Sequence, residues 1–485
     1  MLALVSLALA YAWPLQGGGG VPNAHYVLVK ALADGTPRID ATLGQVGDFS
    51  TYDYIRLNGH RYANKAPGFA FLNVPAYTVL RALGMRTTGD PARMLWALGL
   101  LAVVLPAVVL AALVRDRSER LEPGFGTAAA VTGGLATLLL PYATIFLSHV
   151  LSAALLFGAF ALLWREREGP PRLLLVAAAG LLAGYAITTE YPNALGAAIL
   201  GVYALLRPGR VRRALAFGVG ALAGVFPLAL YNWWAFGSPA HLSYSGPDWP
   251  ASELFDTPSP RILLELLFSA NGLVVLTPVV ACGVVGAVLL LRQGARAEAF
   301  VVAGVVGAYL VFNSAYLSPF GGYSPGPRHL IAMLPFLAVA LAPAFRALPV
   351  TTGALALVSG VVMALVTATH ALAGYDRHWL DRLEARETTS TAASLLGVTG
   401  WYTILPFFAA AAAAAAFAFA ASRAVRPHVW DTLLAGGAVL AWAALAISAP
   451  GESSAGEYGA YSTLWVVIGV SALAVLGLRA IRSAV

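Results

Sequence analysis

Apolar runs of eighteen or more residues recur along most of the chain, and short polar stretches separate them. Runs of that length are typical of helices that cross a bilayer, because about 20 helical residues span its hydrocarbon core. The pattern predicts an all-α polytopic membrane protein with about fourteen transmembrane helices. They cover roughly residues 1–16, 92–114, 125–142, 146–164, 173–189, 193–206, 214–233, 271–291, 299–316, 328–345, 350–372, 401–422, 430–448 and 461–478.

The first of these runs, residues 1–16, lacks the positive start and the small-residue cleavage site of a signal peptide. We therefore interpret it as a transmembrane helix. Segment 17–91, which follows, mixes polar and apolar residues over a long stretch. Helical spacing predicts one helix over Ala24–Leu32 and another over Tyr62–Leu83, the second interrupted by Pro67-Gly68 and Pro75. The pattern fits helices that lie at the membrane surface, and it equally fits ordinary packing against neighbouring spans. The chain then continues as a transmembrane core (92–345) and a group of C-terminal helices (346–485).

The composition supports a membrane protein, since 59% of the residues are apolar and 11% are charged, against about 25% charged in soluble domains. The single cysteine, Cys282, excludes an intramolecular disulfide framework and a cysteine metal cluster. The net charge of +7 comes from arginines in short loops, not from the single basic face of a nucleic-acid-binding protein. We therefore expect membrane lipids as partners and no nucleic acid.

The arginines divide unequally between the two sides of the predicted membrane. Loops on the side of the termini carry most of them, in groups at 115–120, 165–172 and 207–213. Because cytoplasmic loops are rich in arginine and lysine, the bias predicts cytoplasmic termini and an extracytoplasmic segment 17–91. Frequent arginine and alanine further suggest a GC-rich prokaryotic genome, and hence a plasma (inner) membrane.

Groups that can do chemistry concentrate on the predicted outer side. Segment 17–91 holds both lysines of the chain, Lys30 and Lys65, together with several aspartates and two histidines. The predicted inner loops are short and contain no Walker A sequence and no glycine-rich nucleotide fingerprint. An enzyme that works outside the cytoplasm has no nucleotide sugar available, so an activated lipid is the usual donor.

The most distinctive motif of the segment is Gly59-His-Arg-Tyr62-Ala-Asn-Lys65-Ala-Pro67-Gly68. It resembles the Gly-x-x-Tyr-x-x-Lys-x-Pro element in the first outer loop of GT-C glycosyltransferases of the protein-mannosyltransferase and aminoarabinose-transferase type. Asn23 is a departure, because it stands where that family has an acidic residue. Later pieces look like the same family, and the motifs together cover roughly residues 20–330. These pieces are Thr189-Glu190-Tyr191-Pro192, Tyr231-Asn232, Phe236-Gly237-Ser238-Pro239 and Gly326-Pro327-Arg328.

The resemblance implies a GT-C-like bundle in which juxtamembrane helices lie between the first two spans. It also implies an enzyme that moves a hexose or pentose from a polyprenyl-phosphate-linked sugar, the donor substrate, to a hydroxyl of a glycan, lipid or protein acceptor. Asp40 or Asp48 falls where the catalytic carboxylate of the family lies. Dependence on a divalent metal stays open, with His149 and Asp40 as candidate ligands, because no tight cluster of His and Asp declares a site.

The reaction itself also calls for particular residue types. A carboxylate must deprotonate or orient the acceptor hydroxyl, and a lysine or arginine must stabilise the departing phosphate. We expect Lys65 and Arg328 to bind the phosphate. The candidate carboxylates are Asp40, our first choice, then Asp48 and Asp53, and also Glu190 at the end of an apolar run. The further candidates for substrate contacts are His60, Tyr62, Asn23 and Tyr323.

Each of these residues also has a plain structural interpretation. A loop aspartate can be solvated or cap a helix, and a lysine or arginine can anchor a span at the interface. Two other classes of protein also remain, a secondary transporter or flippase for a lipid-linked or anionic substrate and a non-catalytic scaffold. Transporters usually place ionisable groups inside spans and show repeated halves, whereas the charges here lie at the predicted outer ends of spans.

Overall fold

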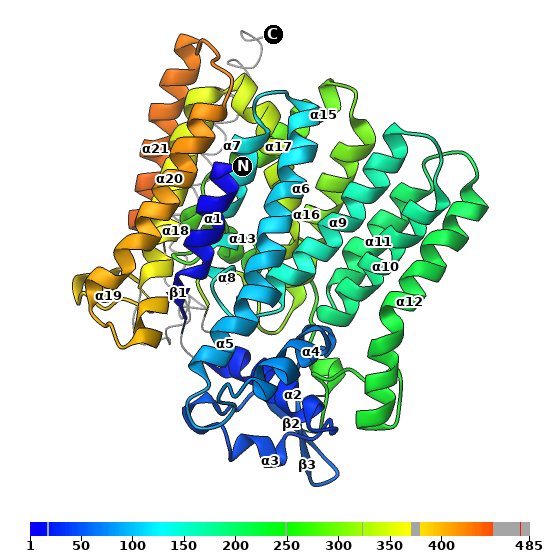
Figure 1. The fold of residues 1–485 in the computed structure, drawn as a ribbon. Helices are drawn as coiled ribbons and strands as arrows, with labels where there is room; N and C mark the ends of the chain where they lie inside the picture. The colour runs from blue at the N-terminus through cyan, green and yellow to red at the C-terminus, as the bar shows by residue number, and fades with distance from the viewer. Residues whose placement is uncertain (17–18, 248–249, 323, 370–378, 450–475, 477–485) are drawn as a thin grey trace.

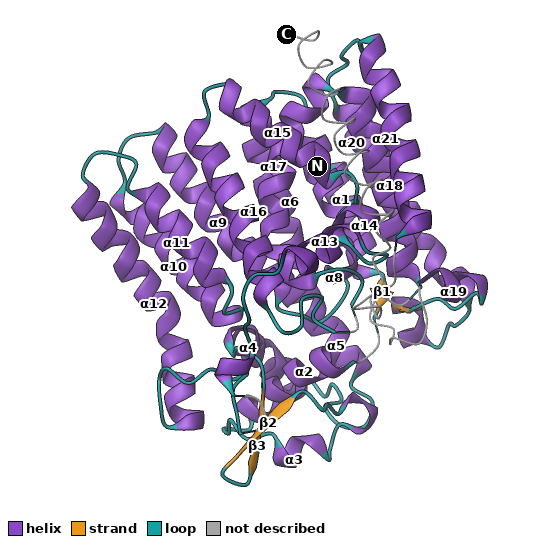
Figure 2. Cartoon of the chain, turned by 180° about the vertical axis from the view of Figure 1, so that it is seen from behind, coloured by secondary structure: helices purple, strands orange, loops and turns teal. Residues whose placement is uncertain are grey.

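The computed structural model describes residues 1–16, 19–247, 250–322, 324–369, 379–449 and 476. It is mostly helical (71%), and its long helices run side by side as a bundle (Figures 1 and 2). Among the described residues, eight helices are long and apolar enough to cross a membrane, and one bent pair would add a ninth. The chain is therefore a multi-pass membrane protein.

The ends of the bundle helices gather at two opposite ends of the molecule (Figure 1). Segment 17–91 lies at the lower end in that view, which we call the loop end, and we call the other the arginine end. The helices before residue 240 are α1 (Leu2–Ala12), α5 (Ala92–Gly99), η2 (Leu100–Val104), α6 (Leu105–Leu121), α7 (Gly126–Leu135), α8 (Leu139–Tyr142), α9 (His149–Glu168), α10 (Leu173–Thr189), α11 (Asn193–Ala204) and α12 (Arg210–Phe236).

The second half of the chain adds further helices to the bundle. One of its short strands also pairs with a short strand near the N-terminus. Strands β1 (Pro14–Leu15) and β4 (Ser390–Thr391) are antiparallel. The later helices are η3 (Ala251–Glu253), α13 (Pro260–Phe268), α14 (Leu273–Leu276), α15 (Val280–Arg292), α16 (Arg296–Ala315), η4 (Arg328–Met333), α17 (Leu334–Ala347), α18 (Pro349–Ala368), α19 (Trp379–Glu384), η5 (Ala392–Leu396), η6 (Trp401–Ile404), α20 (Leu405–Ala421) and α21 (Val429–Ser448).

The predicted count of fourteen spans is not confirmed. The predicted span 271–291 is a bent pair, with an angle of 90° between Pro260–Leu276 and Val280–Arg292. Pro278 lies at the break, where it lacks an amide hydrogen and its ring opposes a continuous helix. The predicted span 125–142 divides into α7 and α8, and α1, α10 and α11 are apolar helices of 10–17 residues. The predicted span 461–478 lies almost wholly outside the described residues.

Segment 17–91 folds as a small layer of its own under the bundle. It contains α2 (Gly20–Ala33), α3 (Asp40–Leu43), η1 (Gly47–Phe49), β2 (Tyr54–Leu57), β3 (His60–Ala63) and α4 (Gly68–Ala82). The helix predicted over Ala24–Leu32 is present as the middle of α2. The helix predicted over Tyr62–Leu83 begins only at Gly68, so that prediction is wrong for Tyr62.

Tyr62 instead belongs to a β-hairpin, which the all-α prediction did not include. Strands β2 and β3 pair from Tyr54↔Ala63 to Leu57↔His60. The turn between them is Asn58-Gly59, and both residues have positive φ (50° and 77°). Asparagine followed by glycine is the preferred sequence for such a two-residue turn, because both positions need the left-handed region.

Glycines hold α10 and α12 in backbone contact. A Cβ on Gly180 or Gly184 would collide with carbonyl groups of α12, and a Cβ on Gly220 or Gly224 would collide with those of α10. Small residues allow this approach, which is a common basis of helix association in membranes. We call this contact between the two helices the glycine seam. Glu190 lies at the loop end of α10, so the glycine seam helps to fix the position of its carboxylate.

Candidate active site

A glycine contact fixes segment 17–91 on the bundle next to the end of α10. Gly68 begins α4 and lies so close to Thr188 that a Cβ would come within 2.5 Å of the Thr188 carbonyl oxygen. Tyr185 donates a hydrogen bond of 2.9 Å to the Gly68 carbonyl oxygen. This contact brings the Lys-x-Pro-Gly motif to Glu190, although the two are far apart in the sequence.

Glu190 is buried, and a chain of polar side chains leads away from it. Ser148 donates a hydrogen bond to Glu190 Oε1, and His149 Nδ1 lies 3.5 Å from the same oxygen. The Ser148 hydroxyl oxygen is also 3.2 Å from His25 Nε2. The N-terminal end of α9, the C-terminal end of α10 and the middle of α2 therefore supply one connected group.

His25 is neutral in this group, and one of its ring nitrogens has no hydrogen-bond partner among the described residues. Burial, together with the nearby charges of Lys65 and Arg328, lowers the pKa of His25 to about 3. Because the Ser148 hydroxyl donates its hydrogen bond to Glu190, its oxygen is left to accept one, and we assign His25 Nε2–H as the donor to Ser148. His25 Nδ1 is then an acceptor, and it is buried without a hydrogen-bond partner among the described residues.

Lys65 is a buried ammonium group that lacks a hydrogen-bond acceptor in the described part of the chain. Its Nζ lies 3.8 Å from Asp53 Oδ2 and 5.4 Å from the centre of the Tyr244 ring. Burial lowers the pKa of Lys65 to about 8, although the Asp53 charge opposes that shift. The Asp53 side chain is partly exposed, so this pair lies where the buried group meets the surface.

Arg328 begins η4 and is the second cation of the group. A Cβ on Gly321, whose φ is +82°, would collide with the Arg328 guanidinium, so a glycine is required there. Arg328 Nε is buried and has no hydrogen-bond partner among the described residues. The next residue, His329, has its ring centre 5.8 Å from that of His149 and 5.2 Å from that of Tyr316.

Asp40 and His60 form a separate group on the hairpin. Both Asp40 carboxylate oxygens lie 3.2 Å from the backbone nitrogen of Arg61, and His60 Nδ1 is 3.4 Å from Asp40 Oδ2. The side chains of Asp40 and His60 are each 39% exposed. None of the contacts among the described residues links this pair to Lys65 or Glu190.

The other predicted site residues have different surroundings. Asp48 is exposed. Asn23 is buried and donates a hydrogen bond of 2.8 Å to the Ser50 carbonyl oxygen, which holds the loop against α2. Tyr62 is buried with its ring centre 5.2 Å from that of Phe236. Tyr323 lies outside the described residues.

Sequence reasoning did not select His25, Ser148 and His329 as site residues. A usable signal was present for the last two, because each is the neighbour in sequence of a selected residue, His149 or Arg328, at the loop end of a span. In the described part of the chain, no three His, Cys, Asp or Glu side chains are grouped as metal ligands. Of the two candidate ligands, His149 belongs to the Glu190 group and Asp40 to the hairpin group.

No protein-family model matches the chain, and no curated protein matches it. Among solved structures, it is similar to ArnT from Cupriavidus metallidurans in the apo state, with a TM-score of 0.46 and 15% identity over 99% of this chain and 76% of ArnT. The same ArnT bound to undecaprenyl phosphate gives a TM-score of 0.41 and 17% identity over 99% of this chain and 77% of ArnT.

A further match is the apo oligosaccharyltransferase of Archaeoglobus fulgidus, with a TM-score of 0.46 and 14% identity over 96% of this chain and 59% of that protein. ArnT and this oligosaccharyltransferase are both GT-C glycosyltransferases, the family that residues 20–330 resemble in sequence.

Proposed function

We propose that the chain transfers a sugar from a polyprenyl-phosphate donor to an acceptor hydroxyl at the group formed by Lys65, Glu190 and Arg328. We call these three residues the buried charge cluster. We place the cluster on the extracytoplasmic side of a prokaryotic plasma membrane, because the arginine-rich loops lie at the opposite end of the bundle.

One observation carries the proposal: both cations of the cluster are short of hydrogen-bond acceptors. Lys65 Nζ has none within the described residues, and neither has Arg328 Nε. Buried polar groups are almost always hydrogen-bonded. The buried Arg328 Nε, and a Lys65 ammonium whose ion-pair partner Asp53 is 3.8 Å away, therefore need an explanation. A phosphate supplies several acceptor oxygens and a compensating charge, and lysine and arginine are its usual partners.

The position of the cluster favours a phosphate that is attached to a lipid. Glu190 follows α10, and Arg328 begins the apolar segment Arg328–Ala347, so both lie at the loop end of membrane helices. A polyprenyl chain would remain in the membrane while its phosphate reaches this level. The sugar would then lie toward segment 17–91 and the solvent.

In the proposed reaction, the acceptor oxygen forms a bond to the anomeric carbon of the sugar as the bond from that carbon to the phosphate oxygen breaks. The electron pair of the broken bond stays on the phosphate, whose growing charge Lys65 and Arg328 stabilise. The acceptor proton passes to a carboxylate. The products are the glycosylated acceptor and the polyprenyl phosphate.

Asp53 is the carboxylate best situated for the proton transfer. It lies 3.8 Å from Lys65 Nζ, and its side chain is 32% exposed, so an acceptor from solvent can approach it. Glu190 is buried and engaged by Ser148 and His149, which suits a role in holding the cations and His25. Asp40, the first choice from the sequence, remains a candidate that the same experiments test.

Binding of a radiolabelled polyprenyl-phosphate sugar to the purified full chain in nanodiscs tests the proposal. Hydrogen bonds to charged groups contribute about 1.5–3 kcal/mol each, so Lys65→Ala and Arg328→Ala should each weaken binding by about tenfold to a hundredfold. Lys30→Ala is the matched control, because Lys30 is also buried but pairs with Asp34 at 2.9 Å. Donor binding should be unchanged in that variant.

Formation of a labelled product separates a transferase from a transporter. We expect label to move from the lipid to a hydroxyl-bearing glycan, lipid or peptide acceptor. Movement of the intact donor across a liposome membrane without any transfer would instead identify a flippase. Donor binding that is equal in wild type, Lys65→Ala and Arg328→Ala would contradict the proposal.

A further inference from the structure

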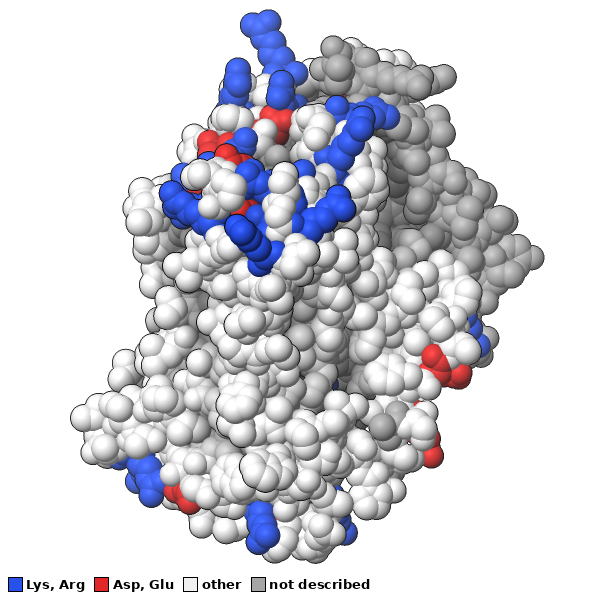
Figure 3. All heavy atoms as spheres, turned by 90° about the vertical axis from the view of Figure 1, so that its right-hand side faces the viewer, with Lys and Arg blue, Asp and Glu red and all other residues white. Residues whose placement is uncertain are grey.

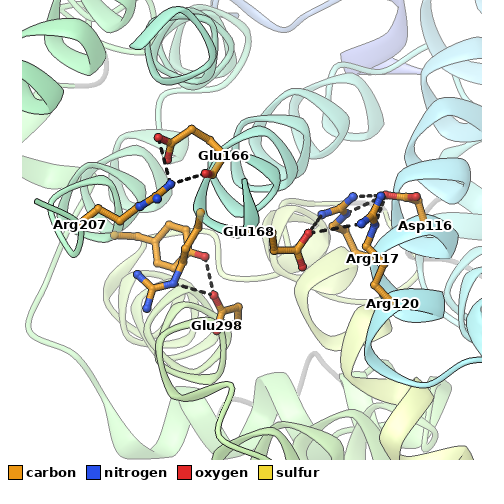
Figure 4. A network of polar contacts seen from close by, with 9 residues as sticks. Asp116, Arg117, Arg120, Glu166, Glu168, Arg207 and Glu298 are labelled. Carbon is orange, nitrogen blue, oxygen red and sulfur yellow. Dashed lines mark hydrogen bonds and ion pairs between the residues drawn. The ribbon is translucent and has the colours of Figure 1, made fainter. Parts of the chain in front are cut away.

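The carboxylates at the arginine end of α9 and α16 are already neutralised by neighbouring arginines (Figure 4). Buried Glu166 accepts hydrogen bonds from both terminal nitrogens of Arg213, at 2.7 and 2.8 Å. Arg207 lies 3.4 Å from the same carboxylate and donates to the Glu166 carbonyl oxygen. Glu298 lies 3.4 Å from Arg167. These arginines hold helix ends together and have little capacity left for a ligand.

Several other arginines at this end have no such partner among the described residues. Arg165, Arg172, Arg210 and Arg212 are exposed, and their guanidinium groups make no contact with another charged or polar side chain of the described residues. Figure 3 shows the basic side chains gathered at one end of this face, above a broad surface with almost no charge. The arginine end therefore carries an uncompensated positive charge, and two of its unpaired arginines also share a cavity.

Arg165 and Arg172 line a cavity between α9 and α10. Its volume is about 170 Å³, and Glu166, Gly169, Pro170 and Leu175 complete the wall. The only carboxylate in this wall, Glu166, is already paired with Arg213. The cavity also lies beside the start of α10, where the helix dipole favours an anion and the backbone amide of Arg172 already donates a hydrogen bond of 3.3 Å to Glu166 Oε1. The cavity thus suits a phosphate group.

The surface next to the cavity is apolar and faces outward. Leu174 on the first turn of α10 is 81% exposed, and Val211 and Leu215 on the first turns of α12 are exposed as well. α10 and α12 pack together, so these exposed apolar side chains belong to one helix pair, which begins beside the cavity at Arg172. A ligand that fits both parts has a phosphate at one end and hydrocarbon at the other.

We propose that Arg165 and Arg172 bind the phosphodiester headgroup of an anionic membrane phospholipid whose acyl chains lie along α10 and α12. The exposed leucines favour a membrane lipid over a soluble phosphate. The site is at the opposite end of the bundle from the buried charge cluster, so it is independent of the proposed transferase reaction. It would anchor the arginine end of the α9–α12 group in its own leaflet.

Native mass spectrometry of the full chain, released from micelles that contain phosphatidylglycerol or phosphatidylcholine, tests this site. The wild type should retain one phosphatidylglycerol in preference to phosphatidylcholine. A basic residue near a membrane surface contributes about fivefold to anionic lipid affinity, so the double variant Arg165→Gln/Arg172→Gln should bind phosphatidylglycerol about thirtyfold more weakly. Binding of the polyprenyl-phosphate donor should stay unchanged and report an intact fold.

Arg423→Gln/Arg426→Gln is the matched control, because these arginines are exposed at the same end but line no part of the cavity. It should retain phosphatidylglycerol as the wild type does. An equal loss in both double variants would mean that only the general positive charge matters and would overturn the site. Equal retention of the two lipids by the wild type, or displacement of the bound lipid by millimolar glycerol phosphate, would overturn it too.

Discussion

The two lysines of the chain occupy contrasting environments. Lys30 Nζ lies 2.9 Å from Asp34 Oδ2, and Asp34 is also bound by Arg81. Lys65 is just as buried, but its nearest carboxylate oxygen is 3.8 Å away. A buried ammonium in this situation is easier to deprotonate, and its pKa falls to about 8 because of burial.

We expect donor affinity to fall as the pH rises through about 8. The protonated form of Lys65, which holds the phosphate, predominates below that pKa and disappears above it. Affinity should therefore be constant at lower pH and decline by up to about tenfold per pH unit above the pKa. A donor-binding titration from pH 6 to pH 10 measures this.

Lys65→Arg supplies the control for that titration. A guanidinium stays protonated throughout the range, so this variant should bind more weakly than wild type at pH 7 but show no decline above pH 8. A wild-type affinity that is flat up to pH 10 would remove the Lys65 ammonium from the phosphate site.

Amide substitutions at three carboxylates identify the proton acceptor. General bases contribute about 10²–10⁴-fold to rate, so Asp53→Asn should reduce turnover by at least about a hundredfold when the donor is saturating. Asp40→Asn should change turnover by less than about threefold, because Asp40 is engaged by the Arg61 backbone and His60. Single-turnover transfer assays separate these outcomes from effects on binding.

The reverse pattern would return the role to Asp40, as the sequence pattern alone suggests. Glu190→Gln should mainly weaken donor binding, because it removes the charge that Ser148 and His149 contact. If none of the three variants slows transfer, the transferase proposal itself fails, and transport becomes the better explanation.

At the scale of elements, the docking of α4 on α10 assembles the candidate site. Sequence motifs identified Lys65 from the Lys-x-Pro element, and Glu190 and Arg328 as ionisable residues at the ends of apolar runs, with Arg328 or His60 as the expected partner of Glu190. They could not show that Ser148 and His25 lie beside Glu190, because that proximity depends on the packing of α2, α4, α9 and α10. The Asn58-Gly59 sequence is typical of a hairpin turn, so the hairpin could be predicted. Nothing in the sequence indicates the close approach of Gly68 to Thr188.

Gly68→Ala should disturb this docking. The added methyl group meets the Thr188 carbonyl, a backbone group that cannot move aside alone. Overpacking of this kind costs about 1–3 kcal/mol, so we expect a lower apparent unfolding temperature and weaker donor binding together. Thermal unfolding in detergent and the donor-binding assay measure the two effects.

Gly44→Ala is the matched control, because a Cβ there meets nothing within 4 Å and its φ of −75° suits any residue. It should leave both measurements unchanged. Wild-type donor binding in Gly68→Ala would show that α4 can shift without affecting Lys65, against the arrangement described here.

At the scale of the whole molecule, the two ends of the bundle differ in chemistry. The arginine end carries ion pairs such as Glu166–Arg213 and several exposed arginines that have no polar partner among the described residues, and the loop end carries the buried charge cluster. The apolar runs of the sequence predicted the membrane class and most long helices correctly. They did not predict where helices break, because a break such as that near Pro278 depends on local backbone chemistry within an apolar run.

Cysteine labelling tests which end faces the outside. Cys282 is buried and free, so a Cys282→Ser background removes the native thiol. Tyr52, 95% exposed at the loop end, changed to cysteine should react with an impermeant maleimide in intact spheroplasts. Arg210→Cys at the arginine end should react only after permeabilisation. The opposite labelling pattern would invert the orientation.

The glycine seam between α10 and α12 has a consequence for the energetics of the proposed reaction. Two helices in backbone contact behave as one rigid platform, and segment 17–91 rests on it through Gly68 on α10 and through Tyr62 against Phe236 on α12. The α10–α12 pair therefore holds both Lys65 and Glu190 in place. As negative charge moves from the acceptor oxygen to the phosphate, the charged groups of Lys65 and Glu190 need little reorientation. The reorganisation energy of the proposed step is therefore small.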